Sequence, residues 1–153
     1  MEPEKLVVDW QTVYHLCRHI ATEVVKPDLI IGIAAGGLIP TAMIAKRLKV
    51  YNIDHIGIRS YGEDKKRGNI ELYHEPNLRL VPEHAKILVI DDLLDSGSSF
   101  EYVETYLEEL GYSNIQCASL HFKVKHDDTQ YKPRNFVCGS KCGDVWVSYP
   151  WET

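Results

Sequence analysis

The segment Lys86–Phe100 (KILVIDDLLDSGSSF) concentrates side chains that can do chemistry. Its acids and hydroxyls are three aspartates and three serines: Asp91, Asp92, Asp95, Ser96, Ser98 and Ser99. Hydroxyls, together with the backbone amides of a turn at Gly97, can donate hydrogen bonds to a phosphate at the start of a helix. Carboxylates can accept hydrogen bonds from ribose hydroxyls and can bind a divalent metal ion. The segment therefore predicts a binding site for a ribose-5-phosphate ester.

Three other interpretations of this segment fit less well. Aspartates before a helix are often only a solvated strand end with an N-cap, but here a buried strand, the spacing and a Ser/Gly turn occur together. Enzymes that bind prenyl diphosphates carry DDxxD on long helices, whereas Lys86–Ile90 has the character of a strand. A P-loop triphosphatase requires the pattern G-x4-GK[ST], which the sequence lacks.

Three stretches of the chain have the apolar spacing of amphipathic helices. The first begins after Asp9, which is placed as its N-cap. The second contains Pro40 in its first turn and extends to about Leu48. The third begins at Ser98, directly after the serine-rich turn, and is closed by Gly111, a residue type common at helix C-termini.

Short apolar runs between these helices predict the strands of one sheet. They cover residues 28–34, 54–59, 86–90 and 115–122, with two shorter strands near 135–138 and 145–148. Continuous apolar runs are typical of strands that are covered on both faces, as in parallel sheets. We therefore predict an α/β fold with a mainly parallel, twisted sheet flanked by helices. Ligands in such folds bind at the carboxyl ends of the strands, which brings the loops after residues 33, 59, 90 and 122 around one cleft.

Length and composition narrow the class of protein. The chain has 153 residues, of which 44% are hydrophobic and 25% charged, so we expect one domain spanning residues 1–153. The net charge of −5 argues against nucleic acid as a partner. The first ten residues, MEPEKLVVDW, contain no long apolar run, so we expect no signal peptide, no membrane span and a cytoplasmic location.

The four cysteines do not form a recognisable metal motif. Cys17 lies in a helical pattern and Cys117 in a strand pattern, where both behave as small buried hydrophobic residues. Cys138 and Cys142 form a single C-x3-C pair, and without a second pair a zinc site is the less favoured interpretation.

The segment Lys86–Phe100 resembles the 5-phosphoribosyl-1-diphosphate (PRPP) motif of the type I phosphoribosyltransferases. That motif is an apolar strand, two acidic residues, two apolar residues and then D-[ST]-G-x-[ST], and every position is matched here. The resemblance implies a Mg²⁺-dependent enzyme, with Asp92 as the carboxylate that faces the metal and Asp95 as the catalytic general base. It also implies that PRPP contacts these residues: Asp91, Asp92, Asp95, Ser96, Gly97, Ser98 and Ser99.

A second segment, Ile33–Pro40 (IAAGGLIP), resembles the pyrophosphate loop of the xanthine–guanine and related 6-oxopurine phosphoribosyltransferases. The resemblance implies that Ala35 and Gly36 contact PRPP, because glycine lets the backbone approach an anion closely. The family commonly has Arg or Lys at the position of Ala35. An alanine side chain cannot pair with pyrophosphate, so only a backbone contact remains at this position.

The polar stretch after the second predicted strand resembles the flexible hood of the same family. Ser60 and Tyr61 match the Ser-Tyr dipeptide that opens the hood, and Arg67 matches a position that contacts PRPP. Lys65 and Lys66 can close over the leaving pyrophosphate, or they can be ordinary solvated charges of a surface loop.

The C-terminal part resembles the base-binding portion of the 6-oxopurine enzymes. Lys123 matches a lysine that donates to the purine 6-oxo group. Trp146 matches an aromatic residue that stacks on the purine, and Val147 a residue whose backbone reads the edge of the base. A tryptophan in this region can equally be a packing residue.

The combined resemblance implies transfer of the 5-phosphoribosyl group from PRPP to hypoxanthine, guanine or xanthine in purine salvage. The products are the nucleoside 5′-monophosphate and pyrophosphate, and the family assembles as homodimers or homotetramers. Two alternatives remain open. Ala35 leaves room for a protein that senses PRPP or nucleotides without turnover, and a pyrimidine base can replace the purine.

Overall fold

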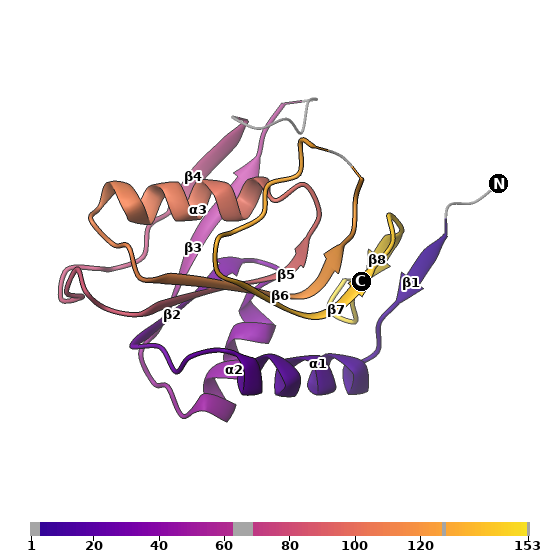
Figure 1. The fold of residues 1–153 in the computed structure, drawn as a ribbon, viewed down its shortest axis with the longest axis horizontal. Helices are drawn as coiled ribbons and strands as arrows, with labels where there is room; N and C mark the ends of the chain where they lie inside the picture. Colours follow the sequence, from indigo (N-terminus) through magenta and orange to yellow (C-terminus); the bar gives the residue numbers. More distant parts are fainter. Residues whose placement is uncertain (1–3, 63–68, 127, 153) are drawn as a thin grey trace.

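The computed structural model describes residues 4–62, 69–126 and 128–152. A six-stranded sheet in the order β4-β3-β2-β5-β6-β7 runs through its centre (Figure 1). β4 pairs with β3 in antiparallel fashion, and the other neighbours are parallel. The strands are β2 (Leu29–Ala34), β3 (Ile53–Ser60), β4 (Ile70–His74), β5 (Ile87–Leu94), β6 (Ile115–Lys123) and β7 (Phe136–Cys142). The predicted α/β fold with a mainly parallel sheet is confirmed.

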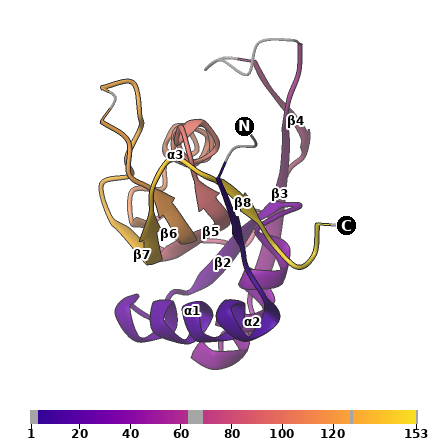
Figure 2. The same ribbon diagram turned by 90° about the vertical axis from the view of Figure 1, so that its right-hand side faces the viewer.

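Helices cover both faces of this sheet. α1 (Trp10–Glu23) and α2 (Leu38–Leu48) lie on one face, and α3 (Ser98–Glu109) lies on the other (Figures 1 and 2). The predicted N-cap is confirmed, because the Asp9 carboxylate accepts a hydrogen bond of 2.8 Å from the backbone N–H of Thr12. Gly111 follows α3 with a φ of 98°, as its predicted role at the helix end requires.

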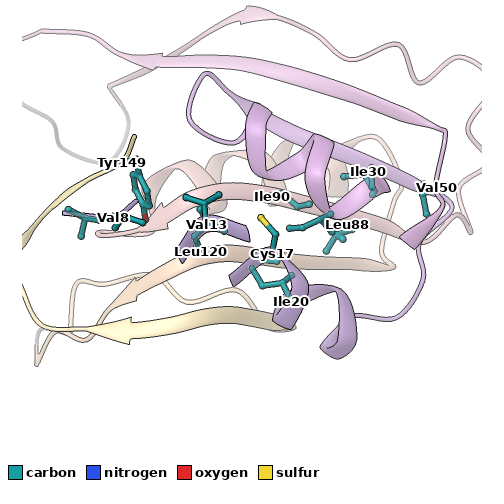
Figure 3. Close-up of a cluster of buried hydrophobic side chains, with 14 residues drawn as sticks. Val8, Val13, Cys17, Ile20, Ile30, Val50, Leu88, Ile90, Leu120 and Tyr149 are labelled. Carbon is teal, nitrogen blue, oxygen red and sulfur yellow. The ribbon is translucent and has the colours of Figure 1, made fainter. Parts of the chain in front are cut away.

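Alternating side chains of the central strands supply two hydrophobic cores. On one face, Ile30 and Leu88 pack with Cys17 and other residues of α1 (Figure 3). On the other face, Ile31 and Val89 pack under α3. Because neighbouring residues of a strand face opposite sides, both layers need apolar residues. This explains the unbroken apolar runs of β2 and β5.

Two short strands form a separate parallel sheet at one end of the molecule. β1 (Lys5–Val7) pairs with β8 (Trp146–Ser148), with Leu6 opposite Val147. The two strands lie close together in both views, and Figure 1 shows them at one end of the molecule, beyond the central sheet. The strand predicted near residues 145–148 is therefore present, but its partner β1 and the edge strand β4 were not predicted. Among the described residues, no helix combines the length and apolar character needed to cross a membrane.

Candidate active site

The acidic pair of the serine-rich segment lies within β5, not at its end as the sequence suggested. The strand continues past Asp91 and Asp92 because its backbone keeps pairing with β6, with Leu94 opposite Phe122. The apolar residues between the acidic pair and the turn are therefore strand residues. The strand ends one residue before Asp95.

Asp91 and Asp92 form a tightly coupled pair of carboxyl groups. Asp91 Oδ1 accepts a hydrogen bond of 2.8 Å from the backbone N–H of Asp92. Burial, and then the charge of Asp92, raises the pKa of Asp91 well above its ordinary value. Burial also raises the pKa of Asp92, and Glu152 adds to the effect, while a hydrogen bond from Asp91 opposes it. Asp91 therefore holds a proton more strongly than Asp92 does.

The serine-rich turn encloses a small cavity at the N-terminus of α3. Gly97 has a φ of 85°, and Ser96 Oγ lies 2.8 Å from Ser98 Oγ and accepts a hydrogen bond of 3.2 Å from the Ser98 backbone N–H. The cavity has a volume of about 70 Å³ and is lined by Leu93, Asp95, Ser96, Gly97, Ser98, Ser99 and Phe100. Hydroxyls and helix N-terminal amides around such a hollow suit a phosphate group. The structure therefore brings together the residues predicted for the phosphate.

A neighbouring loop supports this turn from behind. The backbone N–H of Tyr131 donates a hydrogen bond of 2.8 Å to the carbonyl oxygen of Ser96. A Cβ atom at position 97 would overlap the carbonyl oxygen of Tyr131. Gly97 is therefore required both for its positive φ and for this close approach.

Two lysines converge on Asp95. Lys123 Nζ lies 3.2 Å from Asp95 Oδ2, and Lys125 Nζ forms an ion pair with Asp95 Oδ1. Burial would raise the pKa of the Asp95 carboxyl, but hydrogen bonds and charge from Lys125 and Lys123 hold that pKa below its ordinary value. Asp95 is therefore ionised at neutral pH, as a general base must be.

Sequence reasoning missed Lys125 and Gln130 at this point. The Gln130 amide donates hydrogen bonds of 2.7 Å to the carbonyl oxygen of Asp95 and 2.8 Å to that of Lys123, and so joins the ends of β5 and β6. Lys125 lies two residues after Lys123, which is the spacing that puts extended residues on one side of the chain. That spacing was the sequence signal for Lys125. Gln130 lies in a loop, where no such pattern indicates its role.

The predicted pyrophosphate loop packs against Asp92, and the two together border a larger cleft. The cleft has a volume of about 490 Å³ and is lined by Ala35, Gly36, Leu38, Ile39, Asp92, Trp151 and Glu152. A Cβ atom at position 36 would overlap the Asp92 carboxylate, so glycine lets the loop pack against β5. Ala35 is exposed and contributes no charge to this cleft. Trp151 and Glu152 bring the C-terminal segment to this cleft.

The segment predicted as the hood follows directly after β3. Ser60 is the last residue of β3, and Tyr61 follows it with an exposed side chain. The backbone N–H of Tyr61 donates a hydrogen bond of 2.9 Å to the carbonyl oxygen of Asn69, which holds the two ends of the segment together. Lys65, Lys66 and Arg67 lie outside the described residues.

The predicted base-binding residues separate into exposed and buried groups. Trp146 has 62% of its surface exposed, whereas the adjacent Val147 has 5%. The Val147 side chain packs in the hydrophobic core, so only its backbone is available to a ligand. The large cleft is lined by Trp151 and not by Trp146. Trp146 and Val147 therefore stay predictions as base-binding residues.

A buried hydrogen-bond chain connects the C-terminal segment to β5. The Tyr149 hydroxyl donates a hydrogen bond of 3.0 Å to the carbonyl oxygen of Asp92 and lies 2.8 Å from His121 Nδ1. Because the single hydroxyl proton is used by Asp92, His121 must donate from Nδ1. Burial lowers the pKa of His121, which fits a neutral ring. The Tyr149 ring stacks on Trp151 with centroids 4.9 Å apart, and so positions a side chain of the cleft.

Comparison with known proteins places these features in one family. The family model described as phosphoribosyl transferase domain matches residues 5–148. The xanthine-guanine phosphoribosyltransferase of Ruegeria sp. (strain TM1040) is 25% identical over 95% of this chain and 84% of its own length.

Two solved structures resemble the whole chain. The purine phosphoribosyltransferase of Pyrococcus horikoshii Ot3 has a TM-score of 0.79 and 25% identity, over 97% of this chain and 94% of its own. A hypothetical protein from Neisseria gonorrhoeae, solved with bound ppGpp, has a TM-score of 0.76 and 25% identity, over 100% of this chain and 92% of its own. The similarity therefore extends over the serine-rich turn, the segment Ile33–Pro40 and the C-terminal segment together.

Proposed function

Because the chain belongs to the phosphoribosyl transferase domain family, we propose that it transfers the 5-phosphoribosyl group of PRPP to a 6-oxopurine base. One observation carries this proposal. An ionised Asp95 borders the small cavity of the serine-rich turn, which we propose holds the 5-phosphate. Asp95 also contacts Lys123, the residue predicted to bind the 6-oxo group of the purine. A ribose held by its 5-phosphate in that cavity has its reacting carbon near a base and a cation.

The reaction breaks the bond between C1 of the ribose and the pyrophosphate oxygen, and forms a bond from C1 to a purine nitrogen. The electron pair leaves with pyrophosphate, while positive charge builds on the ribose ring. Asp95 takes the proton that the purine loses at N7, and its negative charge faces the positive ring. Lys125 keeps Asp95 ionised until that step.

The donor set at Asp92 fits Mg²⁺. Asp92 and Glu152 place two carboxyl groups on the large cleft, and burial raises the pKa of Asp92, so a bound cation would offset an unfavourable charge. Carboxylate oxygens are the ligands that Mg²⁺ prefers. Bound there, Mg²⁺ would neutralise charge on the leaving pyrophosphate. We assign Asp92 as its protein ligand, and Asp91, whose carboxyl holds a proton more strongly, as a contact for the ribose.

The remaining predicted residues have roles around this centre. Ala35 and Gly36 would hold the pyrophosphate through backbone groups, and Ser60, Tyr61 and Arg67 would close the hood over PRPP. Closure excludes water, which would otherwise hydrolyse PRPP. We also propose that the protein acts in the cytoplasm and assembles as a homodimer or homotetramer. Light scattering of the purified protein tests the oligomeric state.

Pyrophosphate release tests the proposed activity directly. The protein is mixed with PRPP and Mg²⁺, and with hypoxanthine, guanine, xanthine or a pyrimidine base in separate reactions. We expect release with at least one oxopurine and none with uracil or orotate. Release of pyrophosphate with a pyrimidine base alone would show that the substrate is a pyrimidine and not a purine. No release with any base would contradict the enzyme assignment.

The second candidate function is nucleotide binding without turnover. Two observations favour it: Ala35 adds no cation to the pyrophosphate loop, and the similar Neisseria gonorrhoeae protein was solved with ppGpp. Calorimetry with ppGpp and with guanosine 5′-monophosphate tests this function. Tight ppGpp binding without pyrophosphate release would support a sensor, whereas turnover that ppGpp inhibits would identify an enzyme with a regulatory ligand.

A further inference from the structure

Three potential metal ligands gather on the hairpin formed by β3 and β4, away from the cleft. Asp54, His55 and His74 each offer a ligand atom, and these atoms all lie within 4.8 Å of one another. In the sheet, Asp54 pairs with Ile31 near the beginning of β2, whereas the proposed substrate site lies at the carboxyl ends of the strands. The three residues therefore form a cluster separate from the Asp92 site.

The two histidines meet because of the register between the strands. His74 is opposite Gly57, and His55 lies two residues before Gly57 in β3. Residues two apart in a strand lie on the same face, and long side chains reach diagonal neighbours. The rings stack in parallel with centroids 4.0 Å apart. Their nitrogens are thus presented side by side at an accessible edge, because His74 is exposed and His55 is half-buried.

Backbone hydrogen bonds hold the carboxylate of Asp54 next to these rings. Asp54 Oδ1 accepts a hydrogen bond of 2.7 Å from the backbone N–H of His55. Asp54 Oδ2 accepts a hydrogen bond of 2.8 Å from the backbone N–H of Asn77. Oδ1 also lies 3.7 Å from His55 Nδ1. A ligating carboxylate that is oriented by further hydrogen bonds is typical of protein metal sites. Asp54 is therefore fixed in place before any ion binds.

We propose that Asp54, His55 and His74 bind a divalent transition-metal ion, with Zn²⁺ as the best-fitting ion. Two imidazole nitrogens and one carboxylate oxygen are a ligand set for zinc, which leaves a fourth position for water, whereas Mg²⁺ and Ca²⁺ prefer oxygen ligands alone. Zinc bonds of about 2.0–2.2 Å require ligand atoms within roughly 4.2 Å of one another. Because the two rings stack in parallel, the histidine side chains must also rotate out of the stack so that both nitrogens point at one ion.

The bound ion would bridge β3 and β4, the two strands that carry the ends of the hood. β3 ends at Ser60 and β4 begins at Ile70 (Figure 1). β4 is an edge strand, and among the described strands β3 is its one pairing partner. A ligand that binds only the folded hairpin stabilises it by mass action. The ion would thus fasten the hairpin beneath the hood without contacting the substrate site.

Titration of metal-free protein with Co²⁺ and Zn²⁺ tests this site. The protein is stripped with a chelator, freed of the chelator and titrated by absorption spectroscopy and calorimetry. We expect one ion per chain, with a Co²⁺ spectrum of nitrogen and oxygen ligation that lacks thiolate charge-transfer bands. His74→Gln, His55→Gln and Asp54→Asn should each weaken Zn²⁺ binding by at least about tenfold.

Two controls separate this site from other sources of metal binding. His84→Gln removes an exposed histidine that precedes β5, and the double variant Cys138→Ser/Cys142→Ser removes the C-x3-C pair. Both should bind Zn²⁺ as the parent does, and Zn²⁺ should raise the Tm of the parent and of both controls but not of His74→Gln. Unchanged Zn²⁺ affinity in His74→Gln, or loss of binding in the cysteine variant, would overturn the proposal.

Discussion

The Lys123 ammonium group lies 3.2 Å from the carboxylate of Asp95, at the adjacent ends of β6 and β5. Only 8% of the Lys123 side chain is exposed, compared with 47% of that of Asp95. A buried cation requires a partner, and the Asp95 carboxylate supplies the charge that neutralises Lys123. The residue proposed to bind the purine and the residue proposed to take its proton thus stabilise each other.

Replacement of the proposed general base should affect turnover and spare binding. We expect Asp95→Asn to reduce kcat by about 10²–10⁴-fold, the usual contribution of one positioned base. PRPP affinity, measured by calorimetry, should change little, because the serine hydroxyls and turn amides remain. Asp128→Asn, which removes an exposed carboxylate of the nearby loop, is the matched control and should retain full activity. An Asp95→Asn protein with parental kcat would exclude this residue as the base.

Lys125 should set the acidic limit of activity. Removal of its charge and hydrogen bond in Lys125→Met raises the pKa of Asp95, which Lys125 and Lys123 now hold below its ordinary value. A base with a higher pKa is protonated at a higher pH, so the acidic limb of the kcat/KM profile should move to higher pH. Lys141→Met, an exposed lysine on β7, should leave the profile in place. An unshifted acidic limb in Lys125→Met would mean that another group produces it.

A cation restored to the pyrophosphate loop should strengthen PRPP binding. Ala35 is exposed at the edge of the large cleft, so a longer side chain fits there without displacing core residues. We expect Ala35→Lys to lower the KM for PRPP by a factor of about 10 to 150, as a charged hydrogen bond of about 1.5–3 kcal/mol would. Ala35→Met adds similar bulk without charge and should not lower it. Equal effects of the two variants would show that bulk, not charge, is responsible.

The buried His121 should make stability sensitive to acid. Burial lowers its pKa below the ordinary value of 6.5, so the unfolded chain binds a proton at a pH where the folded protein does not. This contribution is fully present above pH 6.5 and is lost as the pH falls towards the folded-state pKa. His121→Asn keeps a donor near Tyr149 but cannot be protonated, so its free energy of unfolding should fall less between about pH 7 and pH 5. Chemical denaturation at both pH values measures this, and parallel losses in the two proteins would contradict it.

Two glycines with similar backbone angles should respond differently to alanine. Gly97 and Gly62 have φ values of 85° and 82°, but an added Cβ meets the Tyr131 carbonyl oxygen at position 97, whereas at position 62 it meets no atom of the described residues within 4 Å. Gly62→Ala should cost about 1 kcal/mol of unfolding free energy from backbone strain alone. Gly97→Ala should cost more, and should also weaken PRPP binding, because the Tyr131 loop must move. Equal destabilisation of the two variants would remove the collision as a cause.

The fold was largely predictable because the central strands and helices carry strong, local patterns. Ile30 and Ile31, for example, supply the two opposite cores, so their strand had to be apolar throughout. β1 and β4 escaped prediction because each is short and lies outside the apolar centre. Nothing in the sequence of β1 indicates that it pairs with β8, since that contact depends on the whole fold.

The active site was predictable where its residues are contiguous. The serines, Gly97 and Asp95 share one turn, so their spacing alone places them together. Tyr149, Gln130 and Trp151 could not be found in this way, because their roles arise from contacts with distant strands. The end of β5 was also misplaced, since two aspartates look like a strand boundary, yet backbone pairing with β6 carries them inside the strand.

The pairing of Leu6 with Val147 has a consequence for how the protein forms in the cell. A ribosome makes β1 long before β8. β1 therefore has no pairing partner until synthesis has reached Trp146–Ser148. Contacts between such distant residues are the slowest to form. The central sheet can assemble earlier, and the segment proposed to hold the purine is then completed last. A nascent chain arrested before β8 would contain the whole serine-rich turn but would lack the segment proposed to hold the purine.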